Sequence, residues 1–176
     1  MAEYKGLDLV VTPTDPEHRG YFEAAASGEL VVQRCGACQM LRGTVGAACP
    51  FCMSGEWDWR PVSGLGTIYS YEIVTQPIQP AFGDWVPYPI VLVELDEQRA
   101  VPWRGGGEDE LVSVRLVRNL VRADDPTLPE DEQKVAIGKR VRACFVPLGG
   151  GMALPQFCLS DETPEHEPWQ ATSGRP

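Results

Sequence analysis

The sequence predicts a mainly β protein in which an N-terminal helix and a small metal-binding module precede a barrel of five strands. Three observations support this fold class. Sixteen prolines and eighteen glycines among 176 residues indicate many turns. Four cysteines stand in two closely spaced pairs, and five later segments are dense in β-branched and aromatic residues with no helical pattern between them.

The four cysteines follow the spacing Cys35-x2-Cys38-x10-Cys49-x2-Cys52. Two such thiol hooks facing each other provide the tetrahedral set of sulfur ligands that zinc prefers. A closed four-thiolate site leaves no open position for water or substrate, so we expect a structural Zn²⁺ ion that performs no chemistry. Three alternatives have similar spacing: a disulfide pair in a secreted protein, an iron centre, and a redox-active CxxC pair.

Composition and charge exclude several classes of function. Residues 1–10 lack the basic start and apolar core of a signal peptide, so we expect a cytoplasmic protein whose reduced thiols favour metal over disulfides. The most apolar run, Ile90 to Leu95, is of strand length and well short of the roughly 20 residues that cross a bilayer. A formal net charge of -10 opposes nucleic-acid binding, because affinity for polyphosphate comes mainly from Lys and Arg.

The N-terminal segment should form an extended arm over residues 1–13 and then a helix. Thr14 or Asp15 can cap this helix, Pro16 suits its first turn, and Gly28 is a natural stop. Apolar residues recur on one face at three-to-four spacing, which predicts that this face is buried. They are Tyr21, Phe22, Ala25 and Ala26.

A short strand, residues 30–32, should lead into the first thiol hook, while Trp57 and Trp59 follow the second hook and should pack against the metal module. Five barrel strands are then expected at residues 67–74, 89–96, 111–121, 140–147 and 152–159. Five short strands with glycine-rich corners favour a closed or partly open barrel of the oligomer-binding (OB) type, with a compact sandwich as the alternative.

The connections carry fewer signals. Residues 76–87 are rich in proline and aromatic residues and should be a rigid cover over the barrel or a contact surface. Residues 103–109 should be a flexible connection, and the acidic residues 124–132 a solvated loop. The glycines at 149–151 predict a hairpin centred on Gly151, which would place Phe145 opposite Phe157 and Cys144 opposite Cys158.

With 43% hydrophobic residues, the chain can bury one core plus a small metal-stapled module. We expect four segments. They are an arm and helix at 1–29, a zinc ribbon at 30–60, an OB-fold domain at 61–160, and an acidic C-terminal tail at 161–176.

The order of these features is similar to that of one known family. A helix, the hooks Cys35-Gly-Ala-Cys38 and Cys49-Pro-Phe-Cys52, and a tryptophan-containing exit lead directly into Gly64-Leu-Gly66-Thr-Ile-Tyr-Ser-Tyr71. The segments 89–95 and 137–141 follow in the same order. Over residues 15–160 the chain resembles the acyl-CoA-associated OB-fold proteins with an N-terminal rubredoxin-like zinc ribbon, a domain-of-unknown-function family.

The resemblance implies a non-catalytic accessory subunit of an acyl-CoA-processing complex. Because no hydratase segment accompanies these residues, the expected partner is a thiolase-like aldolase, forming a carbon–carbon lyase complex that cleaves a steroid side-chain CoA thioester by a retro-aldol reaction. A hot-dog-fold enoyl-CoA hydratase or an acyltransferase complex is the alternative partner, and a free-standing acyl-CoA or lipid-binding protein is the alternative class. The segment 99–132 is longer and more acidic than the family pattern suggests.

The sequence shows no grouping of residues that would provide a nucleophile, a general base or an open metal site. We therefore expect no catalysis by this chain alone. His18 and His166 are typical of surface residues. Cys144 and Cys158 are flanked by apolar residues, as is usual for buried, inert thiols.

Contacts with an acyl-CoA or with the partner remain a hypothesis for two sets of residues. Basic side chains on two expected strands can converge on phosphates, or else are solvated or paired with acidic loops of the same chain. These are Arg115, Arg118, Arg122, Lys139, Arg140 and Arg142. Aromatic side chains from the helix and the proline-rich loop can form a trough for an apolar acyl group. These are Tyr21, Phe22, Phe82 and Trp85.

Overall fold

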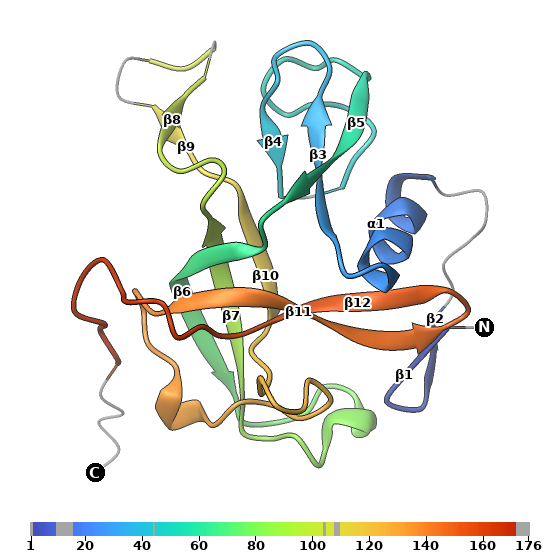
Figure 1. The fold of residues 1–176 in the computed structure, drawn as a ribbon, viewed down its shortest axis with the longest axis vertical. Coiled ribbons are helices and arrows are strands. Elements are labelled where there is room, and N and C mark those ends of the chain that lie inside the picture. Colours follow the sequence, from blue (N-terminus) through green and yellow to red (C-terminus); the bar gives the residue numbers. More distant parts are fainter. Residues whose placement is uncertain (1, 10–15, 44, 104, 108–109, 172–176) are drawn as a thin grey trace.

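The structure, a computed structural model, describes residues 2–9, 16–43, 45–103, 105–107 and 110–171. Its central sheet has five strands in the order β10-β7-β6-β11-β12 (Figure 1). Their bounds are β6 Leu65–Val74, β7 Tyr88–Leu95, β10 Arg115–Asn119, β11 Arg140–Gly149 and β12 Met152–Leu159. Neighbouring strands are antiparallel, and a parallel bridge between Leu120 and Phe157 joins the two outer strands. The mainly β class and the five-stranded barrel are confirmed.

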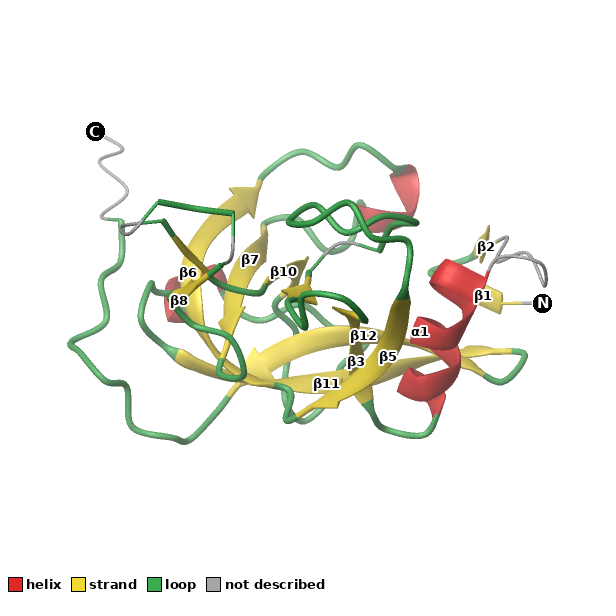
Figure 2. Ribbon diagram, turned by 90° about the horizontal axis from the view of Figure 1, so that it is seen from above, coloured by secondary structure: helices red, strands yellow, loops and turns green. Residues whose placement is uncertain are grey.

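The ribbon, as we call residues 30–62, stands on one end of the barrel beside the helix α1 (Figures 1 and 2). It consists of β3 (Leu30–Cys35), β4 (Leu41–Arg42) and β5 (Trp57–Val62), with β3 in the middle. Helix α1 spans Pro16–Ala26, and Gly28 follows it with a φ of +79°. The expected cap, Thr14 or Asp15, lies outside the described residues.

The expected N-terminal arm forms a small hairpin of β1 (Ala2–Tyr4) and β2 (Leu7–Leu9). Its turn has two residues, Lys5 and Gly6, both with positive φ. Such a hairpin has little sequence signal because each strand has only three residues. Within the described chain, no helix has the length and apolar character needed to cross a membrane.

The main core lies inside the barrel. Alternate residues of β7, namely Val91, Val93 and Leu95, are completely buried because successive side chains of a strand point to opposite faces. Tyr21 of α1 and Val31 of the ribbon join the same cluster. Helix, ribbon and barrel therefore share one continuous hydrophobic core, in which each buried aliphatic side chain contributes about 1.5–3 kcal/mol.

A second cluster closes the other end of the barrel. The loop at 76–87 contains the 3-10 helix η1 (Pro80–Phe82) and packs Phe82 and Trp85 against Tyr88 and Tyr4. Trp85 is only 3% exposed. For these two aromatic residues the cover interpretation of the loop is the one that the structure supports.

The expected strand at 111–121 is wrong in one respect, since it is divided. Leu111–Val112 forms β9, which pairs with β8 (Val101–Pro102) in a separate hairpin, and the barrel strand β10 begins only at Arg115. The break occurs where Ser113 and Val114 bond to residues outside the hairpin: Ser113 Oγ accepts from the N–H of Ala100 and Val114 N–H donates to Gln98. The expected flexible connection 103–109 falls between β8 and β9, and residues 104, 108 and 109 of it lie outside the described residues.

The predicted solvated loop at 124–132 is also wrong in part. Glu130 is buried, and its carboxylate accepts a hydrogen bond from Lys134 Nζ at 3.0 Å. A second 3-10 helix, η2 (Glu132–Lys134), follows, with Asp131 capping its start through the N–H of Gln133.

The predicted hairpin register is wrong by two residues. Gly149 pairs with Met152 across a two-residue turn, and a bulge between Pro147 and Gly149 shifts the ladder further. Cys144 therefore faces Gln156, Phe145 faces Pro155, and Ala143 faces Phe157. Cys144 and Cys158 are diagonal neighbours within the second cluster, and both are buried free thiols.

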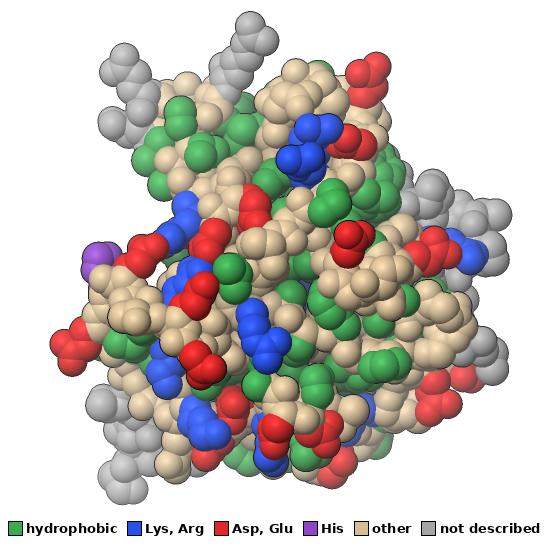
Figure 3. Space-filling model, in the orientation of Figure 1, with side chains coloured by type: hydrophobic (Ala, Val, Ile, Leu, Met, Phe, Trp, Pro, Cys, Tyr) green, Lys and Arg blue, Asp and Glu red, His purple; other side chains and the backbone are tan. Residues whose placement is uncertain are grey.

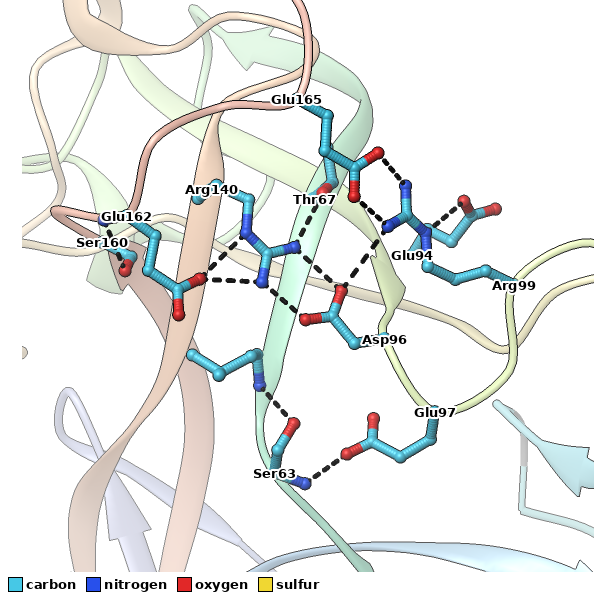
Figure 4. A network of polar contacts seen from close by, with 11 residues as sticks. Ser63, Thr67, Glu94, Asp96, Glu97, Arg99, Arg140, Ser160, Glu162 and Glu165 are labelled. Carbon is cyan, nitrogen blue, oxygen red and sulfur yellow. Dashed lines mark hydrogen bonds and ion pairs between the residues drawn. The ribbon is translucent and has the colours of Figure 1, made fainter.

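Residues 160–171, which we call the C-terminal strap, lie against the barrel through an ion-pair network (Figure 4). Arg140, 8% exposed, donates to both carboxylate oxygens of Asp96 at 2.8 and 2.5 Å and to Glu162 at 2.9 and 2.8 Å. Arg99 holds Glu165 in the same way, at 2.6 and 3.1 Å. The described part of the expected acidic tail is thus attached by its own carboxylates.

We expect Arg140→Met to lower the free energy of unfolding by about 2 kcal/mol, because it leaves partly buried carboxylates without their partner. The hydrogen bonds from Arg140 hold the pKa of Asp96 below its usual value of 3.8. This contribution is therefore present above about pH 4 and is lost as pH falls through the lowered pKa. Urea denaturation at pH 7 and at several lower pH values measures the free energy of unfolding of both proteins. If Arg140→Met and the wild type lost stability equally as pH falls, the pairing of Arg140 with Asp96 would not be the source of this contribution.

Candidate metal centre and adjoining cavity

The two thiol hooks have the same backbone geometry. In the first, the N–H of Cys35 donates to Met40 and its carbonyl accepts from Gln39; in the second, Cys49 makes the same pair of bonds with Ser54 and Met53. Gln39 and Met53 adopt left-handed backbone conformations, with φ of +66° and +61°. Each hook therefore curls its two sulfurs toward the other hook.

The four sulfurs lie close enough together to hold one metal ion. All four are within 4.8 Å of one another; Cys35 Sγ lies 3.5 Å from Cys52 Sγ, and Cys38 Sγ lies 3.6 Å from Cys49 Sγ. Metal–sulfur bonds of about 2.3 Å in a tetrahedron place sulfurs roughly 3.8 Å apart, so the observed spacing fits such a group.

The electrostatics of the first hook favour a thiolate. Burial opposes ionisation of Cys35, but hydrogen bonds from the backbone N–H groups of Cys38 and Ala37 outweigh it and lower the pKa of Cys35 to about 6. Burial and the neighbouring thiols raise the pKa of Cys38 to about 12. A metal cation at the centre would supply the positive charge that the remaining thiols need in order to ionise.

Three contacts hold the ribbon against the barrel and the β8–β9 hairpin. The side-chain amide of the buried Gln98 pairs with both backbone groups of Leu41, at 2.9 and 3.1 Å. The backbone of Gly43 lies so close to β10 that a Cβ there would be 2.0 Å from the carbonyl oxygen of Arg115. Phe51 of the second hook contacts Trp103 of the β8–β9 hairpin, with ring centroids 5.6 Å apart.

A cavity of about 120 Å³ lies where α1, the ribbon and β10 meet. Its walls are mainly apolar, and a slightly larger cavity of about 150 Å³ accommodates benzene in another protein. The lining residues are His18, Tyr21, Phe22, Val31, Val32, Gln33, Arg42, Gly43, Val45, Trp59, Leu116 and Arg118. Helix and ribbon meet closely here, because Gly20 leaves room for the indole of Trp59.

The polar residues of this cavity wall offer donors. Gln33 and Arg42 are 1% and 4% exposed, and Gln33 Nε2, Arg42 Nε and Arg42 Nη2 have no hydrogen-bond partner in the described structure. Arg118 donates to the hydroxyl of Tyr21 at 3.2 and 2.5 Å. Burial raises the pKa of Tyr21, so its hydroxyl keeps a proton at neutral pH. Such a set of donors suits a ligand group that accepts hydrogen bonds.

The structure brings together three of the ten predicted contact residues. Tyr21, Phe22 and Arg118 line the cavity, whereas Phe82 and Trp85 belong to the cluster at the other end of the barrel. Sequence reasoning missed Gln33, Arg42 and Trp59 as cavity residues, because their burial around this space depends on the packing of α1 and β10 against the ribbon.

The other five basic residues do not converge. Three pair with acidic groups: Arg115 with Glu94 at 2.9 Å, Arg122 with Asp124 at 2.7 Å, and Arg140 as described above. Lys139 Nζ donates to the carbonyl of Lys134 at 2.6 Å, and Arg142 lies on an exposed position of β11. On the face drawn in Figure 3, basic side chains lie beside acidic ones and form no patch of one sign. Their roles in ligand contact stay predictions.

We expect about one zinc ion per chain by elemental analysis, and loss of that metal in Cys35→Ala or Cys49→Ala. Structural zinc contributes roughly 10 kcal/mol or more to the folded form, so these variants should lose the ribbon. Cys144→Ala removes a buried thiol outside the site and is the matched control, which should retain its metal. A Cys49→Ala protein with full metal content and unchanged melting would contradict a four-cysteine site.

Comparisons with known proteins agree with the resemblance. The family model described as "ChsH2, C-terminal OB-fold domain" matches residues 59–146. A curated relative from Thermomonospora curvata, named "Probable enoyl-CoA hydratase alpha subunit", is 47% identical over 137 residues. The match covers 78% of this chain but only 35% of that protein, so the chain spans about a third of the length of this relative.

A solved structure has a similar fold. A chain of the structure titled "Ltp2-ChsH2(DUF35) aldolase" is 33% identical with a TM-score of 0.61, and the match covers 85% of this chain and 98% of that one. A DUF35-family protein of unknown function from Sulfolobus solfataricus is 14% identical with a TM-score of 0.47, over 84% and 87% of the two chains. By the family match and the aldolase likeness, this chain belongs to the ChsH2 C-terminal OB-fold family of DUF35 proteins.

Proposed function

We propose that this chain is a non-catalytic accessory subunit of an acyl-CoA-processing complex, with a thiolase-like aldolase as its partner. The observation that carries the proposal is the match to nearly the whole of a chain in the Ltp2-ChsH2(DUF35) aldolase, at 33% identity. The reaction of the complex is the retro-aldol cleavage of a steroid side-chain CoA thioester. Residues of the partner catalyse the cleavage of the carbon–carbon bond.

Zinc is the metal that we propose for the four cysteines. Four sulfur ligands at tetrahedral spacing suit Zn²⁺, and a site closed by four thiolates gives the metal a structural role. Bound there, the ion joins the two hooks and so holds in place the ribbon loop that carries Arg42 and Gly43 to the barrel.

The cavity supports a role in holding part of the acyl-CoA. Its apolar wall can take a few carbon atoms, and the unpartnered donors of Gln33 and Arg42 can bind a carbonyl oxygen of the acyl chain or of the pantetheine arm. Tyr21, oriented by Arg118, can donate to the same oxygen. Because the cavity measures about 120 Å³, the rest of the substrate lies on the partner.

One observation favours a second candidate function, in which the partner is an enoyl-CoA hydratase. The relative from Thermomonospora curvata has the higher identity, 47%, and carries a hydratase name. This chain matches only 35% of that protein, so the name describes a larger molecule. Hydration of an enoyl-CoA by the assembled complex, with no aldol cleavage, would favour this candidate.

Assembly is tested by co-expressing the chain with the thiolase-like protein of its source organism. We expect the two to elute together from gel filtration and aldol cleavage to require both. Separate elution together with full activity of the thiolase-like protein alone would refute the proposal. Calorimetric titration of the isolated chain with acyl-CoA distinguishes a free-standing carrier, which would bind with no partner present.

The role of the cavity is tested by Val31→Phe, which fills it with a larger apolar side chain. We expect the complex to form as before and the KM for acyl-CoA to rise at least tenfold, about 1.4 kcal/mol. Val117→Phe makes the same change on β10, where Val117 is 57% exposed, and should leave the KM unchanged. An unaltered KM in a folded Val31→Phe complex would show that the cavity holds no substrate.

A further inference from the structure

The far half of β6 has one open edge. β7 pairs with β6 along residues 66–74, whereas β11 pairs with it only at Leu65, Gly66 and Thr67. Two more backbone bonds, to Lys139 and from Gly138, extend this contact as far as Ile68. Beyond Ile68, no described strand pairs with this edge of β6.

The main-chain groups on that edge can be identified from the opposite strand. Pro89 has no N–H, and its carbonyl accepts from Leu120 N–H on the β10 side at 3.0 Å. The opposed residues Ile73 and Pro89 therefore exchange no hydrogen bonds, and the N–H and C=O of Ile73 face away from β7. Tyr71, two residues earlier, has the same orientation because a strand alternates with period two.

A cleft of about 1100 Å³ lies along this edge. Its opposite wall is the end of the C-terminal strap, where Trp169 exchanges two backbone hydrogen bonds with Ile137 and the N–H of Ala171 donates to the hydroxyl of Tyr71 at 2.8 Å. The indole of Trp169 is 60% exposed. The cleft thus has a hydrogen-bonding edge on one side and an exposed aromatic residue on the other.

The charged residues of the cleft indicate which kind of protein segment can bind in it. Glu72 and Glu132 line it, and none of its described lining residues is Lys or Arg. A second copy of this chain is disfavoured, because antiparallel pairing of two β6 edges centred on Glu72 would oppose like charges, and each chain carries a formal charge of -10. A basic segment of another protein is complementary to both carboxylates.

We propose that this edge is a docking site for a basic, extended segment of the partner protein, which adds as a strand beside β6. The segment would bond to the main chain of Tyr71 and Ile73, place positive side chains near Glu72 and Glu132, and contact Trp169. Addition of a strand to an exposed sheet edge is a common mode of peptide recognition, in which main-chain bonds provide affinity and side chains provide specificity. This inference rests on the proposed function, which supplies the partner.

Hydrogen–deuterium exchange on the co-purified complex with the thiolase-like protein tests the main-chain contact. We expect the amides of Tyr71 and Ile73 to exchange at least tenfold more slowly in the complex than in the isolated chain. A complex in which residues 70–75 exchange at the same rate as in the isolated chain would overturn the inference and leave the proposed function intact. Failure to form any complex would overturn both.

The charge contact is tested by the double variant Glu72→Lys with Glu132→Lys. We expect its Kd for the thiolase-like protein to rise at least tenfold. Glu29→Lys makes the same kind of change at an exposed position outside the cleft and should alter the Kd less than twofold. Equal affinities of the double variant and Glu29→Lys would overturn the inference, as would a dimer of this chain in which residues 70–75 are protected from hydrogen exchange.

Discussion

The backbone contact between the ribbon and β10 is the constraint on which the candidate site depends. Gly43 touches the carbonyl of Arg115 so closely that no side chain fits between them. Through this contact the ribbon, α1 and β10 enclose the cavity. Residues of its wall, such as Tyr21 and Arg118, are nearly a hundred residues apart in the sequence. Neither the ribbon nor the barrel would form this cavity alone, and the two thiol hooks matter to it because the loop that contains Gly43 runs between them.

Local patterns in the sequence predicted much of this fold. The cysteine spacing identified four sulfurs that lie within 4.8 Å of one another, and β-branched segments located the barrel strands. The misses arose where long-range contacts override local pattern. Residues 111–121 look like one strand, but the bonds of Ser113 and Val114 turn the chain between β9 and β10. The pairing register of β11 with β12 depends on a bulge between Pro147 and Gly149, and the residue types there did not predict this bulge.

The side chains of the site were harder to predict than its elements. Basic residues alternate along two strands, and spacing alone cannot say which carboxylates they meet; Arg140 meets Asp96 and Glu162 from distant segments. Gln33 and Arg42 carry a different signal, since polar groups that are buried without a hydrogen-bond partner in the described structure cost free energy. That signal exists only in three dimensions, because burial is set by the packing of α1 and β10 against the ribbon.

The β8–β9 hairpin interrupts the path between β7 and β10, yet those two barrel strands pair over all five residues of β10. An excursion at such a point lengthens the loop without disturbing the ladder, and closure entropy grows only slowly with loop length. Changes in the length or composition of the β8–β9 hairpin are therefore compatible with a closed barrel. Since Trp103 between these two strands contacts Phe51 of the second thiol hook, such changes alter the surface around the ribbon and leave the core in place.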